Sequence, residues 1–142
     1  MKSILVSACL LGKPCRFDGK SKPCPAVLAI SSRYTLIPVC PEVLGGLPTP
    51  RTPSEIVGDR VLMQDGRDVT QNYHKGARRA LECAIEHGCD TAILKERSPS
   101  CGCGKVYDGT FSRTLTDGNG ITASLLLSHG LRVLGESELD RL

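Results

Sequence analysis

The sequence predicts an α/β protein built in three layers. A mostly parallel, Rossmann-like sheet carries helices on both faces, and a small β-hairpin lies beside it. Two observations support this. Short apolar runs typical of strands buried on both faces recur along the chain, and segments with helical spacing of apolar residues alternate with them. The chain has 142 residues, about the usual size of one domain. We therefore expect a single domain over residues 1–142.

The first half of the chain predicts two strands and the helix between them. Residues 2–8 form an apolar run that suits the first strand, and a loop with glycines and a proline follows over residues 11–20. Residues 24–30 predict a short helix. Residues 34–39 predict the second strand, and the Gly- and Pro-rich residues 43–52 predict a loop without regular structure.

A hairpin and a long helix are expected next. Residues 60–63 and 67–69 flank Asp65-Gly66, a dipeptide that suits a tight hairpin turn. The periodic apolar residues that follow predict a helix over residues 70–87, with Thr70 as its cap and Gly88 as its stop.

The last third of the chain predicts two more strands. Residues 91–94 form the third strand, and a polar, Gly-rich stretch follows over residues 107–120. Residues 121–128 predict a helix, and residues 131–134 predict the last strand. This β-α-β alternation is what predicts the parallel sheet.

Three cysteines each come after a predicted strand. Cys9 follows the first strand, Cys40 the second, and Cys101 comes shortly after the third. Because the carboxyl ends of parallel strands open on one edge of the sheet, these thiols are expected to converge. Three thiolates around one cavity can hold an iron–sulfur cluster or a metal ion and leave one position open for chemistry.

The other five cysteines give a weaker signal. Cys83 and Cys89 are interpreted as structural, since free cysteine is often a small core residue. Cys15, Cys24 and Cys103 lie in or beside loops, and their roles stay open. The chain has no repeated Cys-x-x-Cys pair, which disfavours a zinc site without excluding it.

Composition narrows the class of protein. The net charge of +3 is spread along the chain, whereas a nucleic-acid site needs clustered Lys and Arg. No apolar run reaches the roughly 18 residues of a membrane span, and the first residues lack the pattern of a signal peptide. We therefore expect a cytoplasmic protein, in which eight cysteines indicate metal binding or catalysis rather than disulfides.

Polar residues beside the cysteines are candidates for chemistry. Glu42 lies two residues after Cys40. Its carboxylate either faces the cavity, where it would handle a proton or activate water, or is simply solvated. Ser98 and Ser100 precede Cys101. Their hydroxyls either bind a ligand or only form the turn.

Five motifs occur in a fixed order along the chain. They are Ser7-Ala8-Cys9-Leu10-Leu11-Gly12, Cys15-Arg16-Phe17-Asp18-Gly19, Pro38-Val39-Cys40-Pro41-Glu42, Gly45-Gly46-Leu47-Pro48-Thr49-Pro50-Arg51, and Leu94-Lys95-Glu96-Arg97-Ser98-Pro99-Ser100-Cys101-Gly102. Together they resemble the DUF523 family, which includes the bacterial thiouracil desulfidases. The resemblance extends over nearly the whole chain.

The resemblance implies a 4Fe–4S cluster held by Cys9, Cys40 and Cys101. Its fourth iron would be free to bind the sulfur of a thiocarbonyl substrate. Glu42 would act on protons or water, and a serine of the Ser-Pro-Ser-Cys motif, Ser98 in preference to Ser100, would help to hold the substrate. The products would be uracil and a hydrosulfide that is bound at the open iron and then released.

The implied activity is therefore an iron–sulfur-dependent desulfidase that cleaves the C–S bond of a thiolated pyrimidine such as thiouracil. The chain ends soon after the sheet, which favours a free base or nucleoside over tRNA. We expect a monomer or homodimer with no stable nucleic-acid partner. Two alternatives stay open: a non-catalytic iron–sulfur or zinc-binding module that serves a partner protein, and a dithiol redox protein using Cys101 and Cys103. The spacing of that pair departs from Cys-x-x-Cys, which weakens the second alternative.

Overall fold

Four parallel strands form the centre of the molecule in the computed structural model, which describes residues 1–142. In spatial order they are β2 (Tyr34–Val39), β1 (Lys2–Ser7), β5 (Thr91–Leu94) and β8 (Arg132–Gly135). Each lies within a residue or two of its expected bounds. Neighbouring strands are parallel throughout, so the predicted fold class is confirmed.

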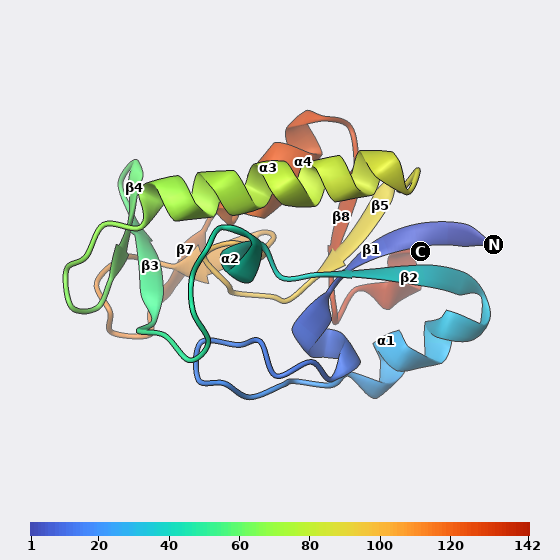
Figure 1. Ribbon diagram of the computed structural model, residues 1–142, viewed down its shortest axis with the longest axis horizontal. Coiled ribbons are helices and arrows are strands. Elements are labelled where there is room, and N and C mark those ends of the chain that lie inside the picture. Colours follow the sequence, from blue (N-terminus) through green and yellow to red (C-terminus); the bar gives the residue numbers. More distant parts are fainter.

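Helices cover both faces of this sheet (Figure 1). Helices α3 (Thr70–Glu86) and α4 (Ile121–Ser128) cover one face, and α1 (Pro25–Ala29), with the short turns Ala8–Leu11 and Ile30–Ser32, covers the other. A last short turn spans Leu139–Arg141. None of the helices combines the length and the apolar character that crossing a bilayer would require.

Alternation along the strands produces the two apolar layers. Leu5 and Leu94 belong to the cluster under α3 and α4, whereas Ile4, Val6 and Ile93 belong to the cluster under α1. Successive side chains of a strand point to opposite faces, so a continuous apolar run supplies both layers at once. All five of these side chains are at most 1% exposed.

Two small antiparallel sheets lie beside the main sheet. One pairs β3 (Ser54–Val57) with β4 (Arg60–Met63), and the other pairs β6 (Lys105–Tyr107) with β7 (Leu115–Asp117). The second sheet forms within and just before the stretch 107–120 that was expected to be irregular. Its strands have three residues each, too short for a periodic pattern to reveal them.

The predicted hairpin forms one turn earlier than expected. Its turn is at Gly58, which has a φ of +63°, and its strands are β3 and β4 rather than residues 60–63 and 67–69. Asp65-Gly66 does form a turn, but only an isolated bridge between Leu62 and Asp68 follows it. Val61 and Met63 are buried against α3, and this packing fixes β4.

Two further local expectations differ from the structure. The N-cap of α3 is Val69, and the Thr70 hydroxyl instead accepts a 2.9 Å hydrogen bond from the N–H of Val61. A carboxylate oxygen of Asp68 accepts a 2.9 Å hydrogen bond from the N–H of Thr70, so Asp68 takes the capping role that was expected of Thr70. One helical turn, α2 (Pro41–Leu44), also enters the region expected to be loop.

Helix α2 touches the backbone of α3 directly. A Cβ atom added at Gly76 would lie 1.9 Å from the carbonyl oxygen of Pro41, and one added at Gly45 would lie 2.0 Å from that of Asn72. The Asn72 side chain donates a 2.9 Å hydrogen bond to the carbonyl of Gly45, and Arg79 donates one of 2.8 Å to that of Leu44. Only glycine permits this approach, and it fixes the position of the turn after β2.

The crossing of α2 and α3 predicts an unusual effect of alanine in a helix. Alanine normally stabilises a helix interior by about 1 kcal/mol relative to glycine. Gly76→Ala is instead expected to lower the free energy of unfolding by about 2 kcal/mol, because its Cβ has no space. Urea titration would measure this change. Lys75→Ala, at the exposed neighbouring position, is expected to stay within about 0.5 kcal/mol of wild type. An unchanged midpoint for Gly76→Ala would contradict the close contact.

Candidate functional site

A cavity of about 460 Å³ lies at the carboxyl ends of β1, β2 and β5. The chain runs from β1 to β2 on one side and then crosses to β5 on the other side of β1. The direction of strand order therefore reverses at β1, and such reversals leave a crevice outside the strand ends. Ligands of open α/β sheets bind at this kind of position.

Four of the eight cysteines line this cavity: Cys9, Cys15, Cys40 and Cys101. The structure thus brings together the three thiols that follow strands and adds Cys15 to them. Every cysteine of the chain is a free thiol. Cys24, Cys83, Cys89 and Cys103 do not line the cavity, and Cys103 instead lies 3.7 Å from the carbonyl of Val133.

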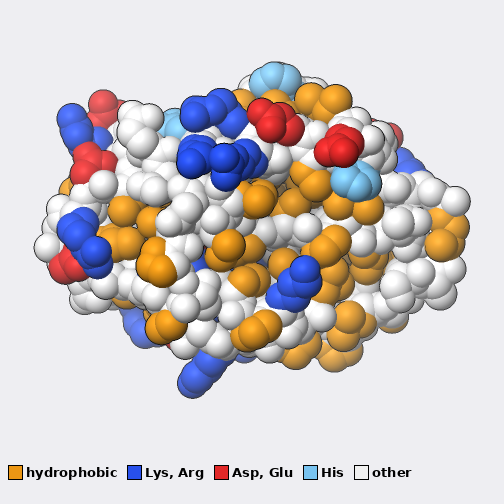
Figure 2. Space-filling view, in the orientation of Figure 1, with side chains coloured by type: hydrophobic (Ala, Val, Ile, Leu, Met, Phe, Trp, Pro, Cys, Tyr) orange, Lys and Arg blue, Asp and Glu red, His pale blue; other side chains and the backbone are white.

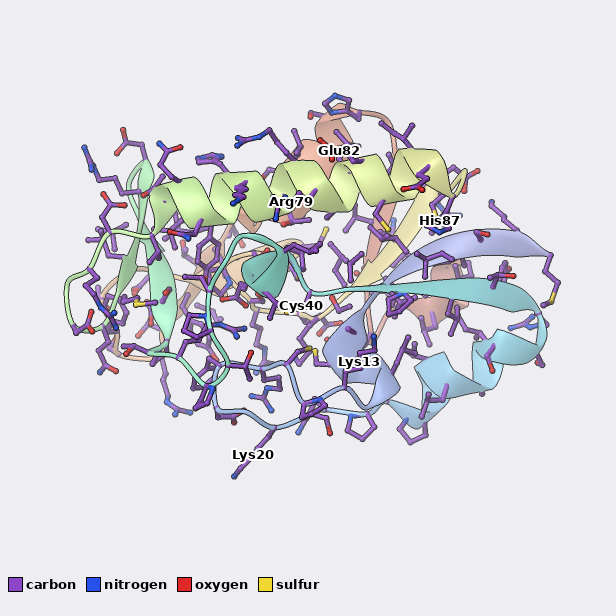
Figure 3. All side chains as sticks on the ribbon, in the orientation of Figure 1. Lys13, Lys20, Cys40, Arg79, Glu82 and His87 are labelled. Carbon is purple, nitrogen blue, oxygen red and sulfur yellow. The ribbon has the colours of Figure 1, made fainter.

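The chain positions each of these thiols at a sharp change of direction. Cys9 lies in the turn that follows β1 and ends at Gly12, whose φ is +97°. Cys40 is the residue before α2, and Pro41 fixes the first turn of that helix. Figure 3 shows Cys40 at the end of β2 beneath α3, whereas Glu82 lies on the side of that helix away from Cys40.

A folded-back loop places Cys15. The N–H of Lys13 donates to the carbonyl of Ala8, and the N–H of Lys22 donates to the carbonyl of Cys9, at 3.2 and 3.0 Å. The loop 12–22 therefore closes over the end of β1. These contacts depend on backbone geometry, which explains why the sequence pattern around Cys15 did not predict its position.

The thiols of the cavity influence one another. A hydrogen bond with Cys15 lowers the pKa of the Cys9 thiol. The pKa of the Cys40 thiol is raised far above the usual range, first by a hydrogen bond with Cys15 and then by burial. Burial raises the pKa of Cys101 to about 12, although the hydroxyls of Ser7 and Ser100 oppose that shift. A positively charged group bound here would remove protons from these thiols, since the thiolate is the form that binds metal.

The donor set suits a cluster better than a single ion. No three His, Cys, Asp or Glu side chains lie close enough to hold one metal ion. The cysteine ligands of an iron–sulfur cluster bind different iron atoms and therefore lie farther apart than the ligands of one zinc ion. Thiolates are also the ligands that such clusters require.

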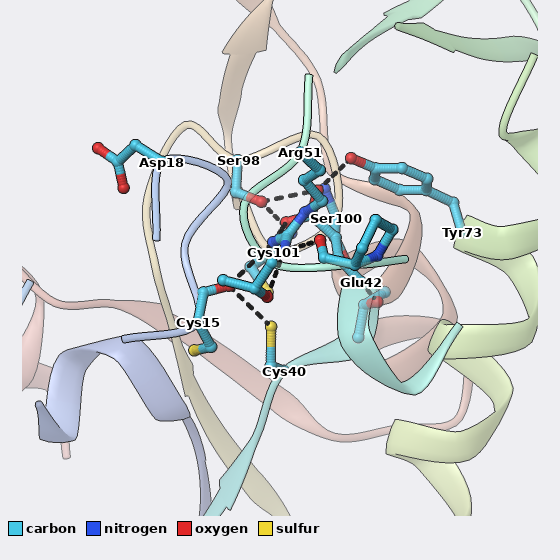
Figure 4. A network of polar contacts seen from close by, with 12 residues as sticks. Cys15, Asp18, Cys40, Glu42, Arg51, Tyr73, Ser98, Ser100 and Cys101 are labelled. Atoms are coloured by element: carbon cyan, nitrogen blue, oxygen red, sulfur yellow. Dashed lines mark hydrogen bonds and ion pairs between the residues drawn. The ribbon is translucent and has the colours of Figure 1, made fainter. Parts of the chain in front are cut away.

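Glu42 lies in the same cavity, on α2. One carboxylate oxygen accepts a hydrogen bond from the hydroxyl of Tyr73, and the other lies 3.3 Å from a guanidinium nitrogen of Arg51 (Figure 4). Burial first, and then the charge of Glu42, raise the pKa of Tyr73 well above its ordinary value, so the phenol stays a donor. Two donors hold the carboxylate, which keeps lone pairs free toward the cavity.

Arg51 connects the parts of the site. It donates to the carbonyl oxygens of Cys15 and Pro48, at 3.0 and 3.1 Å, as well as to Glu42. Its side chain is only 2% exposed, and its Nε has no partner. Neither Arg51 nor Tyr73 was among the site residues expected from the sequence. Arg51 stood in a Pro-rich loop, and Tyr73 belonged to the apolar stripe of a helix.

The two candidate serines have different surroundings. Ser98 lines the cavity, and its hydroxyl oxygen accepts the N–H groups of Ser100 and Cys101, both at 3.1 Å. Ser100 is fully buried and does not line the cavity. Its hydroxyl lies 2.8 Å from that of Thr122. The structure therefore brings Ser98 to the cavity and leaves Ser100 behind the Cys101 turn.

The surface away from the cavity carries charges of both signs. Figure 2 shows basic and acidic side chains along α3, with hydrophobic side chains scattered below them. The cavity itself is lined by more cations than carboxylates: Arg16, Arg51, Lys95, Arg97 and Arg113 against Glu42, Glu55 and Glu96.

Comparisons with known proteins agree with this geometry. The chain is 41% identical over 147 residues to "Uncharacterized protein YbbK" of Bacillus subtilis (strain 168), with 96% of this chain and 97% of that protein covered. It superposes on the solved structure of the "[4Fe-4S]-dependent thiouracil desulfidase TudS (DUF523Vcz)" with a TM-score of 0.92 and 44% identity. That match covers 100% of this chain and 95% of the other.

A family assignment follows from one further match. Residues 4–138 match the family described as 2-thiouracil desulfurase, and this range includes every residue of the cavity named above. The expected resemblance to DUF523 proteins is therefore confirmed, and the chain belongs to the 2-thiouracil desulfurase family.

Proposed function

We propose that this protein is a 4Fe–4S-dependent desulfidase that removes sulfur from a thiolated pyrimidine such as thiouracil. The observation that carries the proposal is the presence of strand-end thiols and a positioned carboxylate, Glu42, in one cavity. The overall reaction exchanges the thiocarbonyl sulfur for the oxygen of water, so thiouracil and water give uracil and hydrogen sulfide.

Cys9, Cys40 and Cys101 are the proposed cluster ligands. They come from the ends of three different strands, which the rigid sheet holds apart around the cavity. Cys15 follows no strand and lies on the loop that Arg51 holds, so we assign it no ligand role. When bound, such a cluster would supply an open iron, a Lewis acid for the soft thiocarbonyl sulfur.

Glu42 is the proposed general base. Its oxygens already accept from Tyr73 and Arg51, and their remaining lone pairs can accept a proton from a water molecule in the cavity. The guanidinium of Arg51 holds one of these oxygens in place. Tyr73 and Arg51 act through Glu42, since they fix its orientation rather than reach the substrate.

Ser98 is the proposed substrate-binding hydroxyl. Its oxygen accepts from two backbone N–H groups, which leaves its O–H free to donate. A donor in this position suits the polar edge of a pyrimidine. Ser100 has its hydroxyl on Thr122 and lies outside the cavity, so we propose that it supports the Cys101 turn.

The remaining expectations are part of the same proposal. Residues 1–142 would form one domain, because strands of the single main sheet come from both ends of the chain. The protein would act in the cytoplasm on a free base or nucleoside, as a monomer or homodimer without a stable nucleic-acid partner. The eight free thiols agree with a reducing compartment.

The ligand assignment predicts a pattern of iron contents. After anaerobic reconstitution, the wild-type protein is expected to hold about four irons per chain. Cys9→Ser, Cys40→Ser and Cys101→Ser are each expected to lower that content severalfold, because a serine hydroxyl is a poor ligand for iron in a cluster. Cys15→Ser and Cys103→Ser are the matched controls and should retain the wild-type content. Iron loss in Cys15→Ser as large as in Cys9→Ser would overturn the three-cysteine assignment.

The raised thiol pKa values predict how iron retention depends on pH. Cys101, with a pKa of about 12, and Cys40 hold protons at neutral pH when no cluster is bound, whereas the ligated forms hold none. Iron retention against a chelator is therefore expected to rise as the pH increases from about 6.5 to 8.5, because the thiols lose their protons to solvent more readily at higher pH. Equal retention at the two pH values would show that loading does not displace these protons.

The role of Glu42 is tested by an isosteric change. Glu42→Gln keeps an acceptor for Tyr73 but cannot take up a proton from water. It is expected to lower kcat for sulfide release from 2-thiouracil by a factor of about 10² to 10⁴. Its iron content should be unchanged. Glu82→Gln, on the outer side of α3, is the control and should turn over like wild type. Wild-type turnover in Glu42→Gln would remove Glu42 from the reaction, and a loaded wild-type protein without turnover would favour the non-catalytic module.

A further inference from the structure

Aromatic side chains are scarce in this chain but gather at the cavity. The sequence contains three tyrosines, two phenylalanines and no tryptophan. Three of these five residues line the cavity: Phe17, Tyr107 and Phe111. Both phenylalanines of the chain are therefore at the site rather than in the core, where Tyr73 is the only buried aromatic side chain. Aromatic faces bind planar heterocycles by stacking, and this tolerates different rings.

The backbone of Phe111 is held by a carboxylate from another hairpin. It lies on the loop 108–114 that joins β6 to β7. Its N–H donates a 3.3 Å hydrogen bond to a carboxylate oxygen of Glu55, and the N–H of Gly109 donates one of 2.9 Å to the same oxygen. Glu55 is a residue of β3, lines the cavity and is only 8% exposed. A buried carboxylate thus holds this loop against the cavity.

The backbone of Phe111 is also strained. Only three residues other than glycine have positive φ angles: Arg97 at 69°, Phe111 at 57° and Arg113 at 60°. All three line this one cavity. A bulky residue in this region costs free energy and persists only where its surroundings determine the conformation. Such residues gather at ligand sites, and here the strain aims one aromatic side chain into the cavity.

The other two aromatic residues of the cavity are placed differently. The guanidinium of Arg16 lies 5.8 Å from the centroid of the Phe17 ring, so one face of that ring already has a partner. Tyr107 lies within β6, and its backbone pairs with Leu115 of β7. Phe111 lies on the loop between these strands, and its ring has no cation partner. Its loop is closed by a chain of hydroxyl contacts through Asp108, Thr110, Ser112 and Thr114.

We propose that Phe111 is a specificity residue of the desulfidase, on whose ring the planar pyrimidine stacks, and that Glu55 is the residue that positions it. The proposal rests on the function proposed above, since it names the contact that selects an aromatic thiocarbonyl. It assigns the two hairpins a task as well: β3 provides the carboxylate, and the loop between β6 and β7 presents the ring.

Phe111→Gly is the decisive variant. Glycine accepts a φ of 57° without strain, so the relief offsets the lost packing, and the melting temperature is expected to stay within about 4 °C of wild type. Loss of one stacking contact is expected to raise KM for 2-thiouracil, and the dissociation constant of uracil, about 5- to 100-fold. The value of kcat should change little. Ser112→Gly adds the same backbone freedom to this loop at an exposed residue outside the cavity lining and also removes two of the hydroxyl contacts that close the loop. It therefore tests loop rigidity without removing the ring, and it should leave both constants unchanged.

Glu55 is tested by a matched pair. Glu55→Gln keeps the oxygen that accepts the two N–H groups, and it should behave like wild type. Glu55→Ala removes the acceptor and is expected to raise KM for 2-thiouracil as Phe111→Gly does, without loss of iron. This split between KM and kcat, with recovery in Glu55→Gln, separates positioning of Phe111 from a general loss of stability.

The wild-type enzyme is assayed first, so that the two proposals can fail separately. If the loaded wild-type protein releases no sulfide from 2-thiouracil, the proposed function fails and this inference fails with it. If the wild type turns over and Phe111→Gly leaves KM and uracil affinity unchanged, only the stacking role is overturned. An equal rise of KM in Ser112→Gly would also overturn it, because loop rigidity rather than the ring would then be responsible.

Discussion

The site depends on one buried cation. Arg51 holds Glu42 on α2, the carbonyl of Cys15 on the first loop, and the carbonyl of Pro48 on the loop that follows α2. A buried guanidinium is costly unless charged and polar partners surround it. These three segments therefore have to come together around Arg51. One guanidinium nitrogen of Arg51 contacts both Glu42 and the carbonyl of Cys15, so these contacts place the carboxylate and the Cys15 loop next to each other at the cavity.

The main sheet supplies the rigid part of this arrangement. Strands β1 and β2 end at Ser7 and Val39, shortly before Cys9 and Cys40, and side chains of the sheet contribute to both apolar layers. The segments around the sheet complete the site through local hydrogen bonds. Arg51 binds the carbonyl of Cys15, and Glu55 binds the backbone of the loop 108–114. This division is common in α/β proteins, where a fixed scaffold positions functional loops.

The sequence could predict the parts that depend on local pattern. The four main strands and the helices α3 and α4 have apolar periodicity of sufficient length, and the order of the strands placed Cys9, Cys40 and Cys101 on one edge. Cys15, Arg51 and Tyr73 reach the cavity through contacts between segments far apart in the chain, which no local pattern contains. Ser100 illustrates the reverse case. It stands one residue before Cys101, yet its hydroxyl faces Thr122 rather than the cavity.

The turn that carries Cys101 has a consequence for how the site is completed. The N–H groups of Gly120, Ile121 and Thr122 donate to the carbonyls of Gly102, Pro99 and Ser100, at 2.7 to 2.9 Å. A Cβ atom at Gly120 would lie 2.4 Å from the backbone of Ser100, so the start of α4 is pressed against this turn. The position of the third thiol therefore depends on α4 being packed against this turn. A chain without α4 would keep Cys9 and Cys40 at the ends of their strands but would not hold Cys101 in place.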